Sequence, residues 1–284
     1  MKWTTLVEPQ SLAGELGNPD LRIVDARFSL TDPALRRAGY EQSHIPRAVY
    51  ADLDQDLSDL GKTGQGRHPL PDEDEFTRKL GQWGIGRGDQ VVVYDAGDGS
   101  MAAARLWWLL RLLGHERVAV LNGGLAAWRA AQLPETSEIP DVDEVAAYPA
   151  RFDRTAIADG DEVLARQSEP KGWLFDVRAA ERFRGEVEPL DTVAGHVAGA
   201  LNYPFSQSLR DGRFRSSAEL HDQLAPVLAG RRPEEMVVMC GSGVTACHLL
   251  LAMEHAGLRG ARVYAGSWSG WISDPTRPIA IGEN

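Results

Sequence analysis

The feature that most constrains the fold is an internal repeat. The first half runs LRIVDARFSL, SHIPRAVYADL, DQVVVYDAGDGSMAAARLWW and VAVLNGGLAAW, and the second half runs WLFDVRAAERF, GHVAGALNYPF, EEMVVMCGSGVTACHLLL and ARVYAGSWSGW. Segments of the same character in the same order indicate a duplicated domain. We therefore predict two domains of one fold, at residues 1–135 and 154–284, joined by an acidic, proline-containing linker at 136–153.

The two copies also match at conspicuous side chains. The aligned pairs are Asp25 and Asp176, Arg27 and Arg178, His44 and His196, Asp95 and Cys240, and Trp128 and Trp271. The Asp, Arg and His pairs occur in both copies, including the copy that lacks a cysteine, so we predict structural roles for them. The first copy keeps the pattern with Asp95 in place of the thiol, which indicates that the fold does not need Cys240.

Short β-branched runs alternate with helical patterns in both copies. RIVDAR, VVVYD and AVLNGG in the first copy, like LFDVR, VVMC and VYAGS in the second, are apolar at successive positions and end in turn residues. The helical patterns include residues 102–113 and 244–255. Such alternation predicts an α/β fold, with a mainly parallel sheet covered by helices on both faces in each domain. Ligands of these sheets bind beyond the carboxyl ends of the strands, where Cys240 lies.

Cys240 has four conceivable fates: a buried structural thiol, half of a disulfide, a metal ligand or a nucleophile. The chain has 2 cysteines, which do not make a disulfide framework. The loop Gly241–Gly243 leads into a helix, and its backbone N–H groups and the helix dipole would stabilise a thiolate. These features favour a nucleophile, although a small apolar side chain at a strand end is the commoner role. Cys247 lies in an apolar helical pattern and is predicted to pack in the core.

Composition restricts the partners. A formal net charge of −11 and the lack of a basic stripe argue against nucleic acid. Charges or glycines interrupt each apolar run, so no membrane partner is expected, and the first residues lack the apolar stretch of a signal peptide, which indicates the cytoplasm. An anionic substrate would need local arginines or helix amino termini to attract it.

The tandem α/β repeat with CGSGVTACH and GSWSGW in its second copy resembles the two-domain sulfurtransferases of the rhodanese family over essentially the whole chain. The resemblance implies a non-catalytic first domain, with Asp95 in the cysteine position, and a catalytic second domain. It implies that Cys240 takes a sulfur atom from a small anionic donor as a persulfide. Cyanide, a small thiol or thioredoxin would then accept the sulfur, without a metal or organic cofactor.

The same resemblance implies the donor and part of its site. A loop of the form CGSGVT is typical of members that use 3-mercaptopyruvate, while members that use thiosulfate usually have basic residues after the cysteine. The backbone of Gly241, Gly243, Val244 and Thr245 would then contact the donor. By motif position, Ser242, His68 in GRHPLP and Asp52 in VYADLD would form a proton relay. On the residues alone, His68 could equally be a solvated loop residue and Asp52 a turn residue.

Arginine is the expected ligand of the donor's carboxylate. Arg182 matches the position of a substrate-binding arginine in the family, but Leu190 stands where a second one is expected. Arg184 or Arg105 could replace it, and each of these arginines could instead form a surface ion pair. Thiosulfate:cyanide transfer therefore remains an alternative.

Two other classes share parts of this pattern. Cysteine phosphatases place a nucleophile on a similar loop, but they need an arginine six residues later, where this chain has Ala246. A persulfide carrier without turnover is also compatible with an intact cysteine loop. Steady turnover of a small donor would separate an enzyme from such a carrier.

Overall fold

The computed structural model describes residues 2–29, 32 and 34–283, which form two compact units. Unit 1 comprises Met1–Asp59, Leu70–Asp153 and Asp211–Phe214, and unit 2 comprises Leu60–Pro69, Arg154–Arg210 and Arg215–Asn284. The segments Leu60–Pro69 and Asp211–Phe214 therefore each belong to the other unit than the boundaries predicted from the sequence would give. The loop Leu60–Pro69 belongs to the unit that carries Cys240, which matters for the site.

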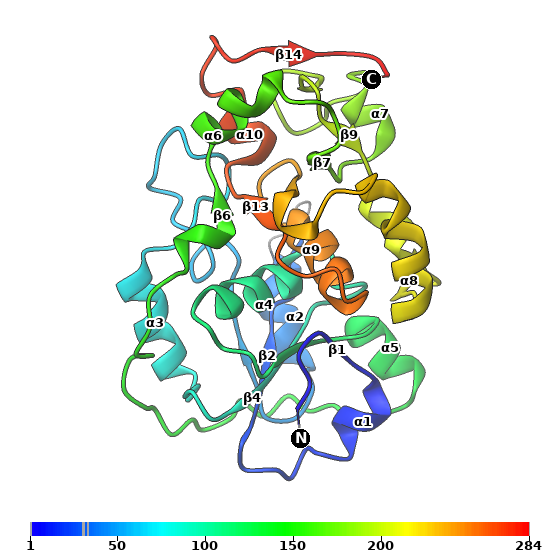
Figure 1. The fold of residues 1–284 in the computed structure, drawn as a ribbon. Coiled ribbons are helices and arrows are strands. Elements are labelled where there is room, and N and C mark those ends of the chain that lie inside the picture. Colours follow the sequence, from blue (N-terminus) through cyan, green and yellow to red (C-terminus); the bar gives the residue numbers. More distant parts are fainter. Residues whose placement is uncertain (1, 30–31, 33, 284) are drawn as a thin grey trace. The chain divides into compact units, whose positions relative to one another are not determined.

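Unit 1 contains a sheet of parallel strands in the order β1-β5-β4-β2-β3. Figure 1 labels β1, β2 and β4 of this sheet. The strands are β1 Leu6–Val7, β2 Leu21–Asp25, β3 Ala48–Tyr50, β4 Gln90–Tyr94 and β5 Val118–Leu121. The helices are α1 Pro9–Ala13, α2 Ala34–Gln42, α3 Glu73–Gln82, α4 Ala102–Leu112 and α5 Gly124–Ala130. One core cluster joins Val92 and Tyr94 of β4 to Leu12 of α1 and Trp128 of α5, while α4 packs against β4 and β5.

Unit 2 repeats this sheet with the order β6-β13-β12-β7-β9, again with parallel pairing. The strands are β6 Ile157–Ala158, β7 Leu174–Asp176, β9 Leu201–Asn202, β12 Val237–Met239 and β13 Arg262–Tyr264, and a separate antiparallel pair joins β8 His196–Val197 to β14 Ile279–Ala280. The α-helices are α6 Gly160–Ala165, α7 Ala180–Phe183, α8 Ser217–Leu224, α9 Ala246–His255 and α10 Ser267–Trp271. Short 3₁₀ turns cover Arg154–Ala156, Arg166–Ser168, Phe205–Ser208, Pro226–Leu228 and Pro233–Glu235, and a two-residue strand covers Leu209–Arg210. The two-residue strand Arg213–Phe214 belongs to unit 1.

The two strand orders are the same when the copies are aligned, with β4 and β12 central in each sheet. This confirms the predicted α/β fold in two copies. Helix α9 begins at Ala246, two residues after the predicted start, because Gly243 turns the chain with a φ of 78° and Thr245 occupies the N-cap position. Of the described residues, no helix is both long enough and apolar enough to cross a membrane.

The duplicated Asp and Arg side chains make the same buried ion pair in each unit. Arg27 Nε donates to Asp25 Oδ1 over 3.0 Å at the end of β2, and Arg178 Nε donates to Asp176 Oδ1 over 3.0 Å at the end of β7. Both carboxylates are fully buried. Because each pair closes the turn that leaves its strand, the structural role expected from the repeat agrees with these contacts.

Candidate active site

Cys240 directly follows β12 and lies between the ends of β7 and β13. The side chain is buried, and the Gly243 N–H donates to its sulfur over 3.2 Å. The Cys240 N–H donates to Ser267 Oγ over 3.0 Å, and that hydroxyl in turn donates to the Tyr264 carbonyl over 2.9 Å. The sulfur is therefore held at the carboxyl end of the sheet with a backbone amide directed at it, where a thiolate is stabilised.

The turn that begins α10 fixes the cysteine loop. Trp268 N–H donates to the Cys240 carbonyl over 3.0 Å, and Ser269 N–H donates to the Gly241 carbonyl over 2.9 Å. A Cβ atom added at Gly243 would lie 2.2 Å from the Ala265 carbonyl oxygen. Glycine is therefore required at position 243, both for this approach and for its positive φ.

Ser242 and His68 are brought together. His68 Nδ1 lies 2.8 Å from Ser242 Oγ, and both side chains are buried. His68 reaches the loop because Leu60–Pro69 packs against the start of α10: Arg67 N–H donates to Ser269 Oγ over 3.0 Å. This hydrogen bond gives the serine hydroxyl a partner that can accept or supply a proton.

Asp52 belongs to unit 1. Its Oδ1 accepts the backbone N–H groups of Asp54 over 2.9 Å and Gln55 over 3.2 Å, which is the arrangement of a turn-capping aspartate. The turn role considered from the sequence is thus visible in the structure. The role of Asp52 as the third member of a relay stays a prediction.

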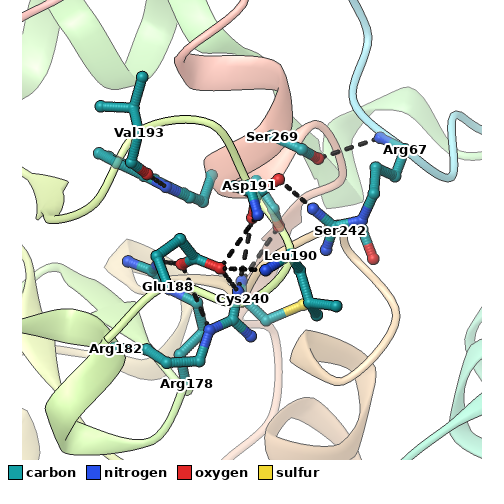
Figure 2. A network of polar contacts seen from close by, with 12 residues as sticks. Arg67, Arg178, Arg182, Glu188, Leu190, Asp191, Val193, Cys240, Ser242 and Ser269 are labelled. Atoms are coloured by element: carbon teal, nitrogen blue, oxygen red, sulfur yellow. Dashed lines mark hydrogen bonds and ion pairs between the residues drawn. The ribbon is translucent and has the colours of Figure 1, made fainter. Parts of the chain in front are cut away.

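Arginines and carboxylates form a partly buried network beside the loop (Figure 2). Arg182 Nη2 donates to Glu188 Oε1 over 2.7 Å and lies 3.4 Å from Asp191 Oδ2. Arg178 Nη1 donates to the other oxygen of Glu188 over 3.3 Å. Arg67 Nη1 forms an ion pair with Asp191 Oδ1. The network therefore joins three guanidinium groups through two carboxylates.

Charge and burial act in opposite directions on the pKa values of this network. Burial acts to raise the pKa of Glu188, but hydrogen bonds from Arg182 and from the backbone of Leu190 and Asp191 bring it below its ordinary value. Burial likewise acts to lower the pKa of Arg178, but Asp176, Glu188 and the charge of Cys240 raise it overall. Both groups are therefore ionised at neutral pH, with Arg178 in electrostatic range of the sulfur.

For the other predicted site residues, the structure shows positions and contacts that do not test a role in substrate binding. Val244 is buried after the loop, and Thr245 occupies the N-cap position of α9. Arg184 Nε pairs with Glu186 over 2.7 Å, which is the surface ion pair considered as its alternative role. Arg105 is fully buried in α4, with its guanidinium carbon 5.2 Å from the centre of the Trp108 ring. The substrate-binding roles of these residues stay predictions.

The sequence did not single out Arg67, Glu188 or Asp191. The available signals were weak: Arg67 precedes His68 in GRHPLP, and the two carboxylates flank the anomalous Leu190. Cys247 is buried and its Sγ donates to the Gly243 carbonyl over 3.3 Å, in agreement with its predicted core position. Within the described part of the chain, no cluster of three or more His, Cys, Asp or Glu side chains could hold a metal ion.

Comparisons with known proteins point to one family. The model of the rhodanese-like domain matches residues 8–131 and 159–274. A probable 3-mercaptopyruvate sulfurtransferase of Pseudomonas aeruginosa is 46% identical over 100% of both chains, and the thiosulfate sulfurtransferase of Rattus norvegicus is 34% identical over 96% of this chain and 92% of its own. The structure of 3-mercaptopyruvate sulfurtransferase from Leishmania major superposes with a TM-score of 0.83 at 33% identity, over 94% of this chain and 73% of that one. The chain therefore belongs to the rhodanese family, as a sulfurtransferase with two rhodanese-like domains.

Proposed function

We propose that this sulfurtransferase takes the sulfur of 3-mercaptopyruvate onto Cys240 and passes it to a thiophilic acceptor. The observation that carries the proposal is the surroundings of the Cys240 sulfur. A backbone N–H is directed at it, and Ser242 of the same loop is hydrogen-bonded to His68 of the loop Leu60–Pro69. The probable 3-mercaptopyruvate sulfurtransferase that shares 46% of its residues with the whole chain supports the same donor.

The first half-reaction forms a persulfide. The Cys240 thiolate attacks the thiol sulfur of the donor, an S–S bond forms, and the C–S bond breaks. The electron pair of that bond leaves on carbon as the enolate of pyruvate, which takes up one proton to become pyruvate. The Gly243 N–H, 3.2 Å from the sulfur, is placed to stabilise the thiolate before the attack and the persulfide after it.

In this proposal, Ser242 and His68 handle the proton. The Ser242 hydroxyl can donate a hydrogen bond to the donor's carbonyl oxygen as charge develops on it, and His68 can replenish that proton through the 2.8 Å contact. Asp52 would orient His68 in this scheme. Arg182, which pairs with both carboxylates of the network, would bind the donor's carboxylate, and the backbone of Gly241, Gly243, Val244 and Thr245 would line the site. These roles are part of the proposal.

The second half-reaction returns the thiolate. An acceptor such as cyanide, a small thiol or thioredoxin attacks the outer sulfur of the persulfide, forms a new bond to it and releases Cys240 as the thiolate. We place this reaction in the cytoplasm, without nucleic acid or membrane partners. Both cysteines are free thiols in the structure, and a reducing compartment would keep Cys240 available.

Thiosulfate is the competing donor, because the rat relative that matches 96% of this chain is a thiosulfate sulfurtransferase. The residues after Cys240 are Gly241, Ser242 and Gly243, which carry no charge to hold a compact dianion. We therefore expect a kcat/KM at least about ten times higher for 3-mercaptopyruvate than for thiosulfate, with cyanide as the acceptor.

Steady-state kinetics with both donors tests this choice. Equal values, or a preference for thiosulfate, would overturn the donor assignment. Loading of one sulfur without turnover, with cyanide or dithiothreitol as the acceptor, would show that the chain acts as a persulfide carrier instead.

A further inference from the structure

We propose that Arg67 is a second guanidinium that binds the donor's carboxylate together with Arg182, and that it thereby determines specificity for carboxylate donors. The inference deepens the proposed function and rests on it in one respect: the sulfur donor must carry a carboxylate, as 3-mercaptopyruvate does. Arg67 lies in the loop Leu60–Pro69, more than one hundred residues before the cysteine loop in sequence.

Arg67 and Arg182 converge on the same point of the backbone. A Cβ atom built on Gly241, the residue after the nucleophile, would lie 3.0 Å from Arg67 Nη2 and 3.6 Å from Arg182 Nη2. Arg182 Nη1 follows at 3.8 Å from the same point. Two guanidinium groups are thus directed at the residue beside the attacking sulfur. A side chain at Gly241 would force Arg67 to move, so glycine here preserves the space between them.

Asp191 holds the two arginines in place. One carboxylate oxygen pairs with Arg67 Nη1 and the other lies 3.4 Å from Arg182 Nη2, and the Asp191 side chain is buried (Figure 2). Arg67 pairs with Asp191 through Nη1, while Arg182 pairs with Glu188 and Asp191 through Nε and Nη2. Each guanidinium has five N–H donors in a fixed fork, so these pairs leave the donors of Arg67 Nη2 and Arg182 Nη1 near Gly241 for a second carboxylate. Asp191 is therefore a positioning residue.

The charges of the network show why Arg67 is needed. Arg178 and Arg182 face three carboxylates, those of Asp176, Glu188 and Asp191. Without Arg67 this group would carry an excess of negative charge beside a thiolate, which would repel an anionic donor. The Arg67 guanidinium makes the numbers of positive and negative groups equal. Leu190, which lies between Glu188 and Asp191 in the sequence, is 45% exposed and carries no charge.

The backbone of the loop fixes the position of Arg67. Its N–H donates to Ser269 Oγ over 3.0 Å, and Ser273 Oγ donates to the Gly64 carbonyl over 3.0 Å. A Cβ atom at Gly66, where φ is 93°, would lie 2.6 Å from the Gly266 carbonyl oxygen. The loop therefore lies directly against the start of α10, and it delivers Arg67 to the network and His68 to Ser242 from adjacent positions.

The inference is tested by alkylation of Cys240, which needs no turnover. Iodoacetate carries a carboxylate and iodoacetamide does not, so the ratio of their rates at Cys240, followed by peptide mass spectrometry, reports the recognition of a carboxylate. We expect Arg67→Gln to lower this ratio about tenfold and Arg67→Lys to lower it less. Arg210→Gln is the charge-matched control, because Arg210 is 58% exposed and pairs with Glu219, and it should leave the ratio unchanged.

Turnover provides the second readout. Arg67→Gln should raise KM for 3-mercaptopyruvate about tenfold or more with a smaller change in kcat, and Arg67→Gln/Asp191→Asn should recover part of the loss because it removes the unbalanced carboxylate. An unchanged alkylation ratio in a folded Arg67→Gln protein overturns the inference. If the wild type does not use 3-mercaptopyruvate at all, the proposed function fails, while the alkylation ratio still decides the role of Arg67.

Discussion

The loop after β4 in unit 1 and the loop after β12 in unit 2 have the same backbone scaffold and different centres. Leu125 N–H donates to the Asp95 carbonyl over 2.9 Å, just as Trp268 N–H donates to the Cys240 carbonyl over 3.0 Å. Asp95 Oδ1 accepts N–H groups of its own loop, from Gly97 over 3.1 Å and Gly99 over 3.0 Å. In unit 2, the sulfur of Cys240 accepts one from Gly243.

Both loops therefore direct backbone N–H groups at an acceptor at the end of the central strand, as anion-binding turns do. In unit 1 the acceptor is the Asp95 carboxylate, which accepts N–H groups of its own loop. In unit 2 the acceptor is a thiol, and Ser242, His68 and the arginines add groups that can bind and protonate a substrate. The comparison shows that both copies of the scaffold provide a turn that directs N–H groups at an acceptor, and under the proposed function the chemistry depends on residues that only unit 2 has.

Replacing the nucleophile should have the largest effect. We predict that Cys240→Ser lowers kcat by at least about a thousandfold, because covalent transfer has no other route. The double variant Cys240→Ser/Asp95→Cys should stay inactive, since a thiol in the unit 1 turn lacks the serine, histidine and arginine partners. Steady-state assays with 3-mercaptopyruvate and cyanide measure both. Activity in the double variant would contradict the distinction drawn between the two loops.

The Ser242–His68 pair is the next difference between the loops. His68→Asn should lower kcat for 3-mercaptopyruvate about 100-fold, because proton transfer by a positioned group is typically worth this much. Ser242→Ala should act in the same direction, and the double variant should be little worse than either single one if the two residues act as a unit. Additive losses would show that they act independently.

The arginine network should affect binding of the donor more than chemistry. Arg182→Gln is expected to raise KM for 3-mercaptopyruvate about tenfold, because it removes a charged donor that faces Gly241. Arg184→Gln should have a smaller effect, since its guanidinium pairs with Glu186. Arg210→Gln serves as the control for loss of a positive charge. Equal effects of the Arg182 and Arg184 changes on kcat/KM would count against the assignment of Arg182.

The smallest effect that we predict is a change in stability when Asp95 is replaced. Burial is the main cause that raises the pKa of Asp95 from 3.8 to about 6 in the folded protein. The fold therefore favours the protonated form, and the stability that this provides is present below about pH 4 and is lost as the pH rises through about 6. At pH 7.5 the protein contains a buried ionised carboxylate, so Asp95→Asn should raise the free energy of unfolding there by about 1 to 3 kcal/mol.

Urea unfolding of the wild type and Asp95→Asn at pH 5 and pH 7.5 measures this effect. The gain should be largest at pH 7.5 and about half as large at pH 5, which lies in the middle of the window between about pH 4 and 6. Equal destabilisation at both pH values would show that the amide disrupts the turn instead.

The sequence predicted the parts that follow from repetition and local pattern. The internal repeat led to the two α/β domains, and the glycines after Cys240 led to the strand–loop–helix turn. Helix α9 was placed within two residues, and the small error has a local cause in the backbone of Gly243 and Thr245. These features depend on neighbours in the chain, which a sequence shows directly.

Arg67 and Asp191 could not be found in this way. The two residues are 124 positions apart and meet only because Leu60–Pro69 packs against the start of α10. A lone arginine in a glycine-rich loop and an aspartate two residues after a proline have no pattern that distinguishes them from surface residues. The absence of an arginine at Leu190 raised the right question, but its answer required the three-dimensional contacts.

The central claim, that Cys240 is the sulfur-carrying nucleophile, is tested most directly by mass spectrometry of the protein incubated with 3-mercaptopyruvate in the absence of an acceptor. We predict a gain of one sulfur atom on the peptide that contains Cys240, its removal on addition of cyanide, and no gain in Cys240→Ser. Sulfur on Cys247 alone, or equal loading of the Cys240→Ser variant, would contradict the account.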